Sequence, residues 1–413
     1  LLSAMSGLAL AQAPGNAPGH APDQILVKFL PGTPEVTKAD IHRKYAGQVV
    51  DVIPRLDVQV VRIPKDKVAE KVKAYKEEAN VEYAEPDYIA EAILVPNEPY
   101  FGKQWGMVKI QAPEAWDITA GSSAVIIAIC DTGIDRNHED LQLKIVLSNN
   151  FTSNGTVDDE NGHGTHVAGI AAAITDNGKG VAGVGFNSSL MNAKVLGKNG
   201  SGYYSWVANG IIWAADNGAK VINLSLGGSS PSATLESAVN YAWYKGCVLV
   251  AAAGNSNTIL PLYPAYYNNC IAVAATDIND NKASFSNYGT WVDIAAPGVD
   301  IFSTLPNHRN KLNKRNYGSL SGTSMATPHV AGVAALVWAT VYGTSNDSVR
   351  NRLQSTADMA GTMYSNYGIK RVNAYNAVAP SAPNNPPVAA GDAYAVDEDN
   401  TLAVAAPGVL GND

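Results

Sequence analysis

The chain has 413 residues, of which 46% are apolar and 16% charged, and its formal net charge is −8. This acidic balance argues against a nucleic-acid partner, because phosphate binding needs a basic face. The many small residues favour a compact α/β enzyme over a disordered or coiled chain. No run beyond the first residues reaches the roughly 18 apolar residues of a membrane span.

Residues 1–13, LLSAMSGLALAQA, are typical of the end of a truncated secretory signal peptide, in which small residues of A-x-A type follow an apolar stretch. A frayed apolar terminus is the alternative. Residues 14–22 form a spacer of Pro, Gly and Ala. The sequence therefore predicts a secreted, extracellular protein.

Residues 23–93 have the pattern of a small α+β unit. The runs QILVKFL, DVQVVRI and VEYAEPDYIAEA predict strands, and PEVTKADIHRKYA and KDKVAEKVKAYKEE predict amphipathic helices. The segment contains no catalytic arrangement of its own.

Residues 94–379 are apolar and rich in Gly, and continuous apolar runs alternate with helical patterns. Such runs predict a parallel sheet covered by helices on both faces. Sheets of this kind bind ligands outside the carboxyl ends of their strands. Because Asp131, Ser225 and Asn255 each end or follow an apolar run, we expect the active site at that edge.

Residues 380–387 predict a Pro-rich linker, and residues 388–413 resemble the start of a truncated β-sandwich repeat module of the Ig-like or cadherin-like kind. A disordered tail is the alternative. Modules of this kind would allow attachment at a cell surface.

Three cysteines are too few, and odd in number, for a disulfide framework. Cys247 and Cys270 each begin an apolar run, so a bridge between neighbouring strands stays open as an alternative. Cys130 directly precedes Asp131, and we interpret it as a small buried residue rather than a nucleophile.

Four residues have local contexts that suit acyl transfer, which needs a nucleophile, a base, a group that orients the base and donors for the oxyanion. Ser324 opens a predicted helix in SGTSMATPHVAGVAAL, where unpaired N–H groups favour negative charge. His163, in NGHGTHVAG, suits a general base near neutral pH. Asp131, in ICDTGID, would offset its burial by pairing with His163. The amide of Asn255, in AAAGNS, supplies a second oxyanion donor.

Neighbouring polar residues receive other interpretations. We expect Asp135 to be solvated beyond the turn and His166 to be structural. A zinc site of His163 and His166 lacks a third ligand and the H-E-x-x-H spacing. Gly162 and Gly164 are expected to leave room for a substrate beside the imidazole.

Together and in this order, DTGID, NGHGTHVAG, AAAGN and SGTSMATPHVAG resemble the signatures of the subtilase family, whose Asp…His…Ser order they share. The resemblance covers about residues 97–379, and PNEPYF, KIQAPEAWDI, VNYAW and PAYY place it in the thermitase-like branch. It implies a subtilisin-like parallel sheet with helices on both faces, preceded by a small α+β propeptide domain.

The same resemblance implies that residues 23–93 are an inhibitor-type propeptide, an intramolecular inhibitor whose tail occupies the cleft until cleavage near Ile93–Leu94 or Leu94–Val95. An independent small domain is the alternative.

The resemblance also implies how substrate binds: as a strand paired through main-chain hydrogen bonds, which makes recognition broad. The residues implied are Gly200, Ser201, Gly202, Ser225, Leu226 and Gly227. An apolar pocket for the P1 residue, which precedes the scissile bond, is implied at Ala252, Ala253 and Gly254. Ser256 offers no carboxylate to select a basic side chain, so we expect large apolar or aromatic P1 residues.

A structural Ca²⁺ site is implied as well, because hard oxygen ligands from scattered segments suit this ion. Its ligands would be the side chains of Glu98, Asp140 and Asn177 and the carbonyls of Ile174, Lys179 and Val181. A second calcium site is weakened because Asn150 and Ser153 replace acids, although Asp158, Asp159 and Glu160 are possible substitutes. A weak cation site would use Asp293 with the carbonyls of Ala265 and Tyr267.

The segment NHRNKLNKRNYG, residues 307–318, is longer and more basic than its counterpart in close relatives. We interpret it as a solvated loop, with an autolysis site or a contact for an acidic surface as alternatives.

The sequence thus predicts a monomeric, secreted, calcium-stabilised serine endopeptidase that acts on protein or peptide substrates and is made as a zymogen. A catalytically idle scaffold in a cell-surface binding protein is the main rival. A non-peptide acyl hydrolase would need a G-x-S-x-G elbow, which the chain lacks around Ser324.

Overall fold

The computed structural model describes residues 19–89, 96–153 and 155–380. The predicted signal peptide, the propeptide cleavage point at residues 93–95 and the module of residues 388–413 lie outside these ranges.

The amino-terminal unit is a four-stranded antiparallel sheet with two helices. Its elements are β1 (His20–Phe29), α1 (Glu35–Lys44), β2 (Gln48–Ile53), β3 (Val58–Arg62), α2 (Val68–Lys76) and β4 (Val81–Tyr88), and the strand order is β2-β3-β1-β4. Alternate residues of β1, Ile25, Val27 and Phe29, are almost fully buried with Tyr75 of α2. The predicted α+β unit is confirmed, but the sequence analysis missed β2, whose side chains are all exposed.

The larger unit is built on a seven-stranded sheet with the order β11-β10-β9-β8-β5-β7-β6, in which every neighbouring pair is parallel. Its strands are β5 (Ile126–Asp131), β6 (Ile145–Asn150), β7 (Ser189–Lys194), β8 (Val221–Leu224), β9 (Val248–Ala252), β10 (Ile271–Thr276) and β11 (Ile294–Pro297). A two-stranded antiparallel sheet of β12 (Ile301–Leu305) and β13 (Asn316–Leu320) accompanies it.

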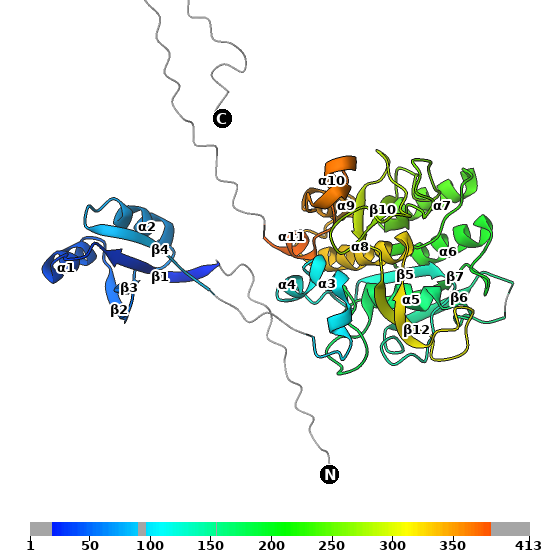
Figure 1. Cartoon of the computed structure of the whole chain (residues 1–413), viewed down its shortest axis with the longest axis horizontal. Coiled ribbons are helices and arrows are strands. Elements are labelled where there is room, and N and C mark those ends of the chain that lie inside the picture. Colours follow the sequence, from blue (N-terminus) through cyan, green and yellow to red (C-terminus); the bar gives the residue numbers. More distant parts are fainter. Residues whose placement is uncertain (1–18, 90–95, 154, 381–413) are drawn as a thin grey trace, which may run out of the picture.

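The helices of the larger unit cover both faces of the sheet (Figure 1). They are η1 (Phe101–Lys103), α3 (Trp105–Lys109), α4 (Ala112–Trp116), α5 (His163–Ala172), α6 (Tyr204–Asp216), α7 (Ala233–Tyr244), α8 (Thr323–Trp338), α9 (Asn346–Ser355), α10 (Gly361–Tyr367) and α11 (Ala374–Val378). Within the described ranges, no helix is long and apolar enough to cross a membrane.

Strand β5 shows how the core is divided. Ile127 and Ile129 belong to one buried cluster with residues of α5 and α8, and Ala128 and Cys130 belong to another with residues of α6 and α7. Because successive side chains of a strand point to opposite faces, the continuous apolar run is explained by burial on both sides. The predicted doubly covered parallel sheet is therefore confirmed.

The three cysteines are buried and free, so the alternative of a Cys247–Cys270 bridge is wrong. The thiol of Cys247 donates to the carbonyl of Ala219 at 3.0 Å. Burial raises the pKa of the Cys130 thiol far above its usual range, which agrees with a packing role.

Candidate active site

Strand β5 and helix α5 bring Asp131 and His163 together. The Asp131 carboxylate is fully buried, and its Oδ1 lies 2.8 Å from Nδ1 of His163. The main-chain N–H of Thr132 donates to the same oxygen at 2.7 Å. Because a carboxylate only accepts hydrogen bonds, Nδ1 of His163 carries the proton and Nε2 is left as the proton acceptor.

The electrostatics of this pair favour the charged imidazole. Burial lowers the pKa of His163, but the charge of Asp131 and its hydrogen bond outweigh burial, so the net pKa is raised above its ordinary value. Such a shift suits a base that must hold a proton during the reaction.

Gly164 allows this close approach. A Cβ on Gly164 would lie 2.2 Å from the carbonyl oxygen of Gly133 and 3.1 Å from Cβ of Asp131. Any side chain there would push α5 away from the end of β5. The expectation that Gly164 leaves room for substrate is therefore wrong, because its space belongs to the neighbouring chain.

Asp159 is a residue that the sequence analysis assigned to a different role. Its buried carboxylate accepts hydrogen bonds from Oγ1 of Thr132 at 2.8 Å, N–H of Gly162 at 2.8 Å and Oγ1 of Thr165 at 2.7 Å. Asp159 thus links Thr132, which follows Asp131, to Gly162 and Thr165 on either side of His163. Burial raises its pKa although these hydrogen bonds oppose the shift. Because its oxygens are engaged internally, Asp159 does not supply the second calcium site considered above.

Ser324 is the second residue of α8, as the predicted helix start requires. Its hydroxyl donates to the carbonyl of Ser225 at 3.1 Å, and the Ser225 hydroxyl donates back to the Ser324 carbonyl at 2.9 Å. In this structure the Ser324 hydroxyl therefore points at the β8 end rather than at the imidazole.

Ser324 and His163 nevertheless line one cleft of about 460 Å³. All six residues predicted to pair with the substrate main chain line it too: Gly200, Ser201, Gly202, Ser225, Leu226 and Gly227. The carboxyl edge of the sheet is thus hollowed where the sequence analysis expected the active site.

The residues predicted to line the P1 pocket lie outside this cleft. Ala252 and Gly254 are buried, and the side chain of Leu262 lies near both Gly227 and Gly254. A Cβ on Gly227 would meet Cδ2 of Leu262 at 2.5 Å, and one on Gly254 would meet it at 3.1 Å. The side chain of Leu262 therefore lies between these two walls of the predicted P1 pocket.

Asn255 is oriented by Thr323, a second residue that the sequence analysis missed. The side-chain oxygen of Asn255 accepts hydrogen bonds from N–H and Oγ1 of Thr323 at 2.8 and 3.0 Å. The N–H of Gly254 donates to the same Thr323 hydroxyl at 3.1 Å. Because the amide oxygen is held in this way, the NH₂ group is left free to donate beside the start of α8.

Two further residues test the expectations around the site. Asp135 is fully buried and accepts hydrogen bonds from N–H of Asn137 and Asn307, so the prediction of a solvated carboxylate is wrong. His166 is buried with Nε2 3.0 Å from the Gly318 carbonyl, and burial lowers its pKa to about 3. A neutral, enclosed imidazole of this kind agrees with a structural role.

Two buried carboxylates meet at the predicted calcium site. Glu98 and Asp140 are 5% and 0% exposed. Asn177 links them, because its main-chain N–H donates to Glu98 at 3.2 Å and its side-chain NH₂ donates to Asp140 at 3.1 Å. Burial raises the pKa of both carboxyl groups.

These carboxylates fit a cation. Oε2 of Glu98 is buried without a hydrogen-bond partner, and no Lys or Arg of the described residues forms an ion pair with either carboxylate. Their donor set is hard oxygen, as Ca²⁺ prefers. Asn177 departs from the expectation, because its NH₂ group rather than its oxygen is turned toward Asp140.

Asp293, which was expected at a weak cation site, already has partners within the protein. Both oxygens of Asp293 are engaged: Oδ1 pairs with Arg350 at 2.9 Å and Oδ2 accepts the N–H of Ala272 at 2.8 Å. An arginine already supplies the positive charge that the cation would bring.

A strand-end carboxylate, an imidazole and a helix-opening serine around one cleft of a parallel sheet are the features of a subtilisin-like serine peptidase. The chain belongs to the subtilase family, whose model matches residues 122–386. The model of the fervidolysin N-terminal prodomain matches residues 9–87.

Individual relatives agree with this assignment. The chain is 54% identical over 285 residues to thermitase of Thermoactinomyces vulgaris, which covers 68% of this chain and 99% of the relative. It is 50% identical over 311 residues to the thermophilic serine proteinase of a Bacillus species, covering 74% and 75% of the two chains. A solved protease structure from Pseudoalteromonas arctica matches with a TM-score of 0.63 and 35% identity, covering 69% and 99%. The chain is therefore a subtilisin-like serine endopeptidase.

Proposed function

We propose that the chain is a secreted, self-processing zymogen that hydrolyses peptide bonds through an acyl-enzyme formed on Ser324. The observation that supports this most directly is the 2.8 Å bond between Asp131 and His163, with Ser324 on the same cleft. Asp131 holds the imidazole in the tautomer whose Nε2 accepts the Ser324 proton and later returns it to the leaving amine.

Charge that develops on the substrate carbonyl oxygen would be met by two donors. One is the N–H of Ser324 in the first turn of α8, where main-chain N–H groups lack helical partners. The other is the NH₂ group of Asn255, whose orientation Thr323 fixes. Donors held in place before the reaction cost no reorganisation in the transition state.

Substrate binding would also release the nucleophile. The carbonyl of Ser225 accepts the Ser324 hydroxyl in this structure, and Ser225 lies in one of the two segments proposed to pair with the substrate strand. A substrate N–H that took this carbonyl would free the hydroxyl to turn toward His163. Substrate recognition and nucleophile activation would then share one acceptor.

The principal rival, an idle scaffold, predicts no reaction at Ser324. We expect a fluorophosphonate probe to label the purified chain at Ser324, as peptide mass mapping would show. Labelling should disappear after denaturation, because the activated hydroxyl depends on His163. An unlabelled native chain that retains its circular dichroism spectrum would favour the scaffold.

The prodomain match supports an inhibitor-type propeptide upstream of the catalytic unit. The chain would be made as an inactive zymogen and would activate itself by cleaving off this propeptide. The mature enzyme would act outside the cell on protein substrates, as a monomer. Broad recognition follows from main-chain pairing.

Leu262 would restrict the P1 residue to small or medium apolar side chains. Replacing Leu262 by Gly should raise the ratio of kcat/KM for Phe over Ala at P1 by at least about 10-fold, because even one methylene group in an apolar pocket is worth about 1–3 kcal/mol. Matched peptide substrates measure the ratio. The control is Leu260→Gly, since Leu260 is 66% exposed. An unchanged ratio in both variants would remove Leu262 from the pocket.

Glu98 and Asp140, with the carbonyls of Ile174, Lys179 and Val181, would hold a structural Ca²⁺. The ion supplies positive charge to two buried carboxylates. In a Ser324→Ala chain, which cannot digest itself, we expect a chelator to lower Tm by about 10 °C at pH 8, the size of effect that binding about 1,000-fold above Kd produces.

The fall in Tm caused by the chelator should be smaller at pH 5 than at pH 8. Both pKa values are raised by folding, so the ion-free fold binds more protons than the unfolded chain and loses stability as pH rises above about 4. Glu98→Gln removes one of the two buried charges of the proposed site. In this variant the chelator should lower Tm very little. An equal response in Glu98→Gln and the parent chain would place the ion elsewhere.

A further inference from the structure

The loop between β12 and β13 carries the imidazole of His308 to two aspartates from distant parts of the chain. One ligand-type atom of each of Asp135, Asp158 and His308 lies within 4.8 Å of the others. Among the described residues, no other group of three His, Cys, Asp or Glu side chains is so arranged. The cluster plays no part in the proposed acyl transfer.

The carboxylate of Asp135 is held in place by main-chain contacts. Asp135 is fully buried, and N–H groups of Asn137 and Asn307 donate to its two oxygens at 2.9 and 2.8 Å. The segment that holds Asp158 lies against Gly133, where a Cβ would come within 2.8 Å of the Asp158 carbonyl oxygen. Asn307 belongs to the same loop as His308, so this loop is already anchored at the site.

The imidazole of His308 is arranged as a ligand. Nδ1 lies 3.2 Å from the carbonyl oxygen of Arg309, which only accepts hydrogen bonds, so Nδ1 carries a proton. Nε2 lies 3.4 Å from Oδ2 of Asp158. Nε2 of His308 and Oδ1 of Asp158 are both buried and without a hydrogen-bond partner within the described chain.

A neutral imidazole would therefore direct a lone pair at a carboxylate, an arrangement that requires a positive charge between or upon them. The charge is either a proton on Nε2 or a metal ion. A bare ion pair would leave Oδ1 of Asp158 buried and unsatisfied, whereas an ion shared by three ligands would satisfy the cluster. The nearby ammonium of Lys194 does not pair with the Asp158 carboxylate. It donates to the main-chain oxygen of Asp158 and pairs with Glu160.

We propose that Asp135, Asp158 and His308 form a binding site for a divalent transition-metal ion of the Zn²⁺ type. Imidazole nitrogen with carboxylate oxygen is the donor set of such ions, while Ca²⁺ and Mg²⁺ take oxygen ligands. Three protein ligands leave a fourth position for water. The hydrogen bond at Nδ1 of His308 fixes the tautomer, as outer partners of metal-bound histidines do.

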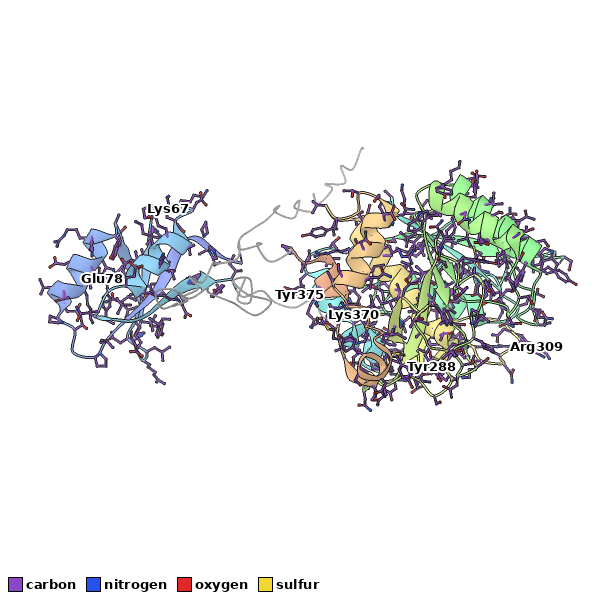
Figure 2. All side chains as sticks on the ribbon, turned by 90° about the horizontal axis from the view of Figure 1, so that it is seen from above. Lys67, Glu78, Tyr288, Arg309, Lys370 and Tyr375 are labelled. Carbon is purple, nitrogen blue, oxygen red and sulfur yellow. The ribbon has the colours of Figure 1, made fainter. Side chains whose placement is uncertain are left out.

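The ion would join three segments around the proposed catalytic residues. Asp135 follows the strand that ends in Asp131, and Asp158 precedes the helix that begins at His163. The loop also bonds next to His163, because N–H of Lys311 donates to the carbonyl of Glu160 at 2.9 Å. Figure 2 shows Arg309 at the outer edge of the catalytic unit. A metal ion at this site would hold the exposed basic loop against the segments that carry Asp131 and His163.

The test uses the full chain carrying Ser324→Ala, with excess Ca²⁺ so that oxygen sites are filled. Zn²⁺ alone is titrated by calorimetry, and bound zinc is counted after equilibrium dialysis. We expect one tightly bound ion per chain. His308→Ala and Asp158→Asn should each weaken its binding by at least about 10-fold, since even outer partners of metal ligands contribute 10–100-fold.

The matched control is His20→Ala, because His20 is also half-buried and its Nδ1 also lies near the next carbonyl, at 2.9 Å from Ala21. Zinc affinity should be unchanged in that variant. His308 and Asp158 are both partly exposed. The Tm of His308→Ala and Asp158→Asn without zinc should therefore match that of the parent, which would show that both variants fold correctly. Equal zinc affinity in all variants, or no stoichiometric zinc in the parent, would overturn the proposal in favour of a His308–Asp158 ion pair.

A second measurement does not depend on affinity. The loop contains Arg309, Lys311, Lys314 and Arg315, all sites for trypsin. Zn²⁺ should slow tryptic cleavage in this loop several-fold in the parent and leave the rate in His308→Ala unchanged. Equal slowing in both chains would show that zinc acts elsewhere.

Discussion

Replacing Ser324 by Ala should lower kcat by about 10⁶, the loss that follows removal of the nucleophile in subtilisin. The N–H of residue 324 and the amide of Asn255 remain, so the variant keeps its oxyanion donors and its substrate cleft. What it loses is the covalent step, and about 8 kcal/mol of transition-state stabilisation with it. Initial rates on a chromogenic peptide, compared with substrate binding, separate the two effects.

The same variant tests self-processing. If the propeptide is removed by the enzyme's own serine, the Ser324→Ala chain should keep residues 23–93 covalently attached, as intact mass would show. Ser321→Ala is the control, since Ser321 is exposed, lies three residues earlier and only accepts the N–H of Asp300 at 2.9 Å. Normal turnover and processing in Ser324→Ala would exclude Ser324 as the nucleophile.

The elements that sequence reasoning recovered are those with a strong local signature. The parallel sheet was predictable because buried strands are continuously apolar, and Asp131 could be placed at its edge because β5 ends in that residue. Ser324 could be placed at a helix start because the apolar period after it is helical. Each inference needed only a few neighbouring residues.

The failures depend on contacts between distant segments. Asp135 seemed solvated because its partner Asn307 is 172 residues away. Nothing in the sequence around Leu262 indicates that it lies near Gly227 and Gly254. Nothing around Thr323 indicates that it hydrogen-bonds to the side chain of Asn255. Strand β2 escaped because exposed side chains on both faces erase the alternation that marks a strand. Local pattern therefore located the chemistry, and tertiary packing decided how each group is oriented.

Asp131→Asn is expected to lower kcat by about 10⁴, second only to the loss of the nucleophile. The Asn side chain can fill the same space, but its NH₂ group would favour a proton on Nε2 of His163, the wrong tautomer for accepting the Ser324 proton. Asp300→Asn, at an exposed residue of the same unit, is the control and should keep full activity.

The pH profile distinguishes this role from general destabilisation. The charge of Asp131 and its hydrogen bond raise the pKa of His163 above that of free imidazole, against the opposing effect of burial. The base must be neutral to act, so kcat/KM of the parent should be complete above this raised pKa and be lost as pH falls through it. In Asp131→Asn the two effects of Asp131 are gone, while burial and the smaller opposing effect of the Asp159 charge remain. The pKa of His163 should therefore fall, and the acid limb of the residual activity should move to lower pH. An acid limb that stayed at the parent's position would mean that Asp131 does not act through His163, whatever the loss in rate.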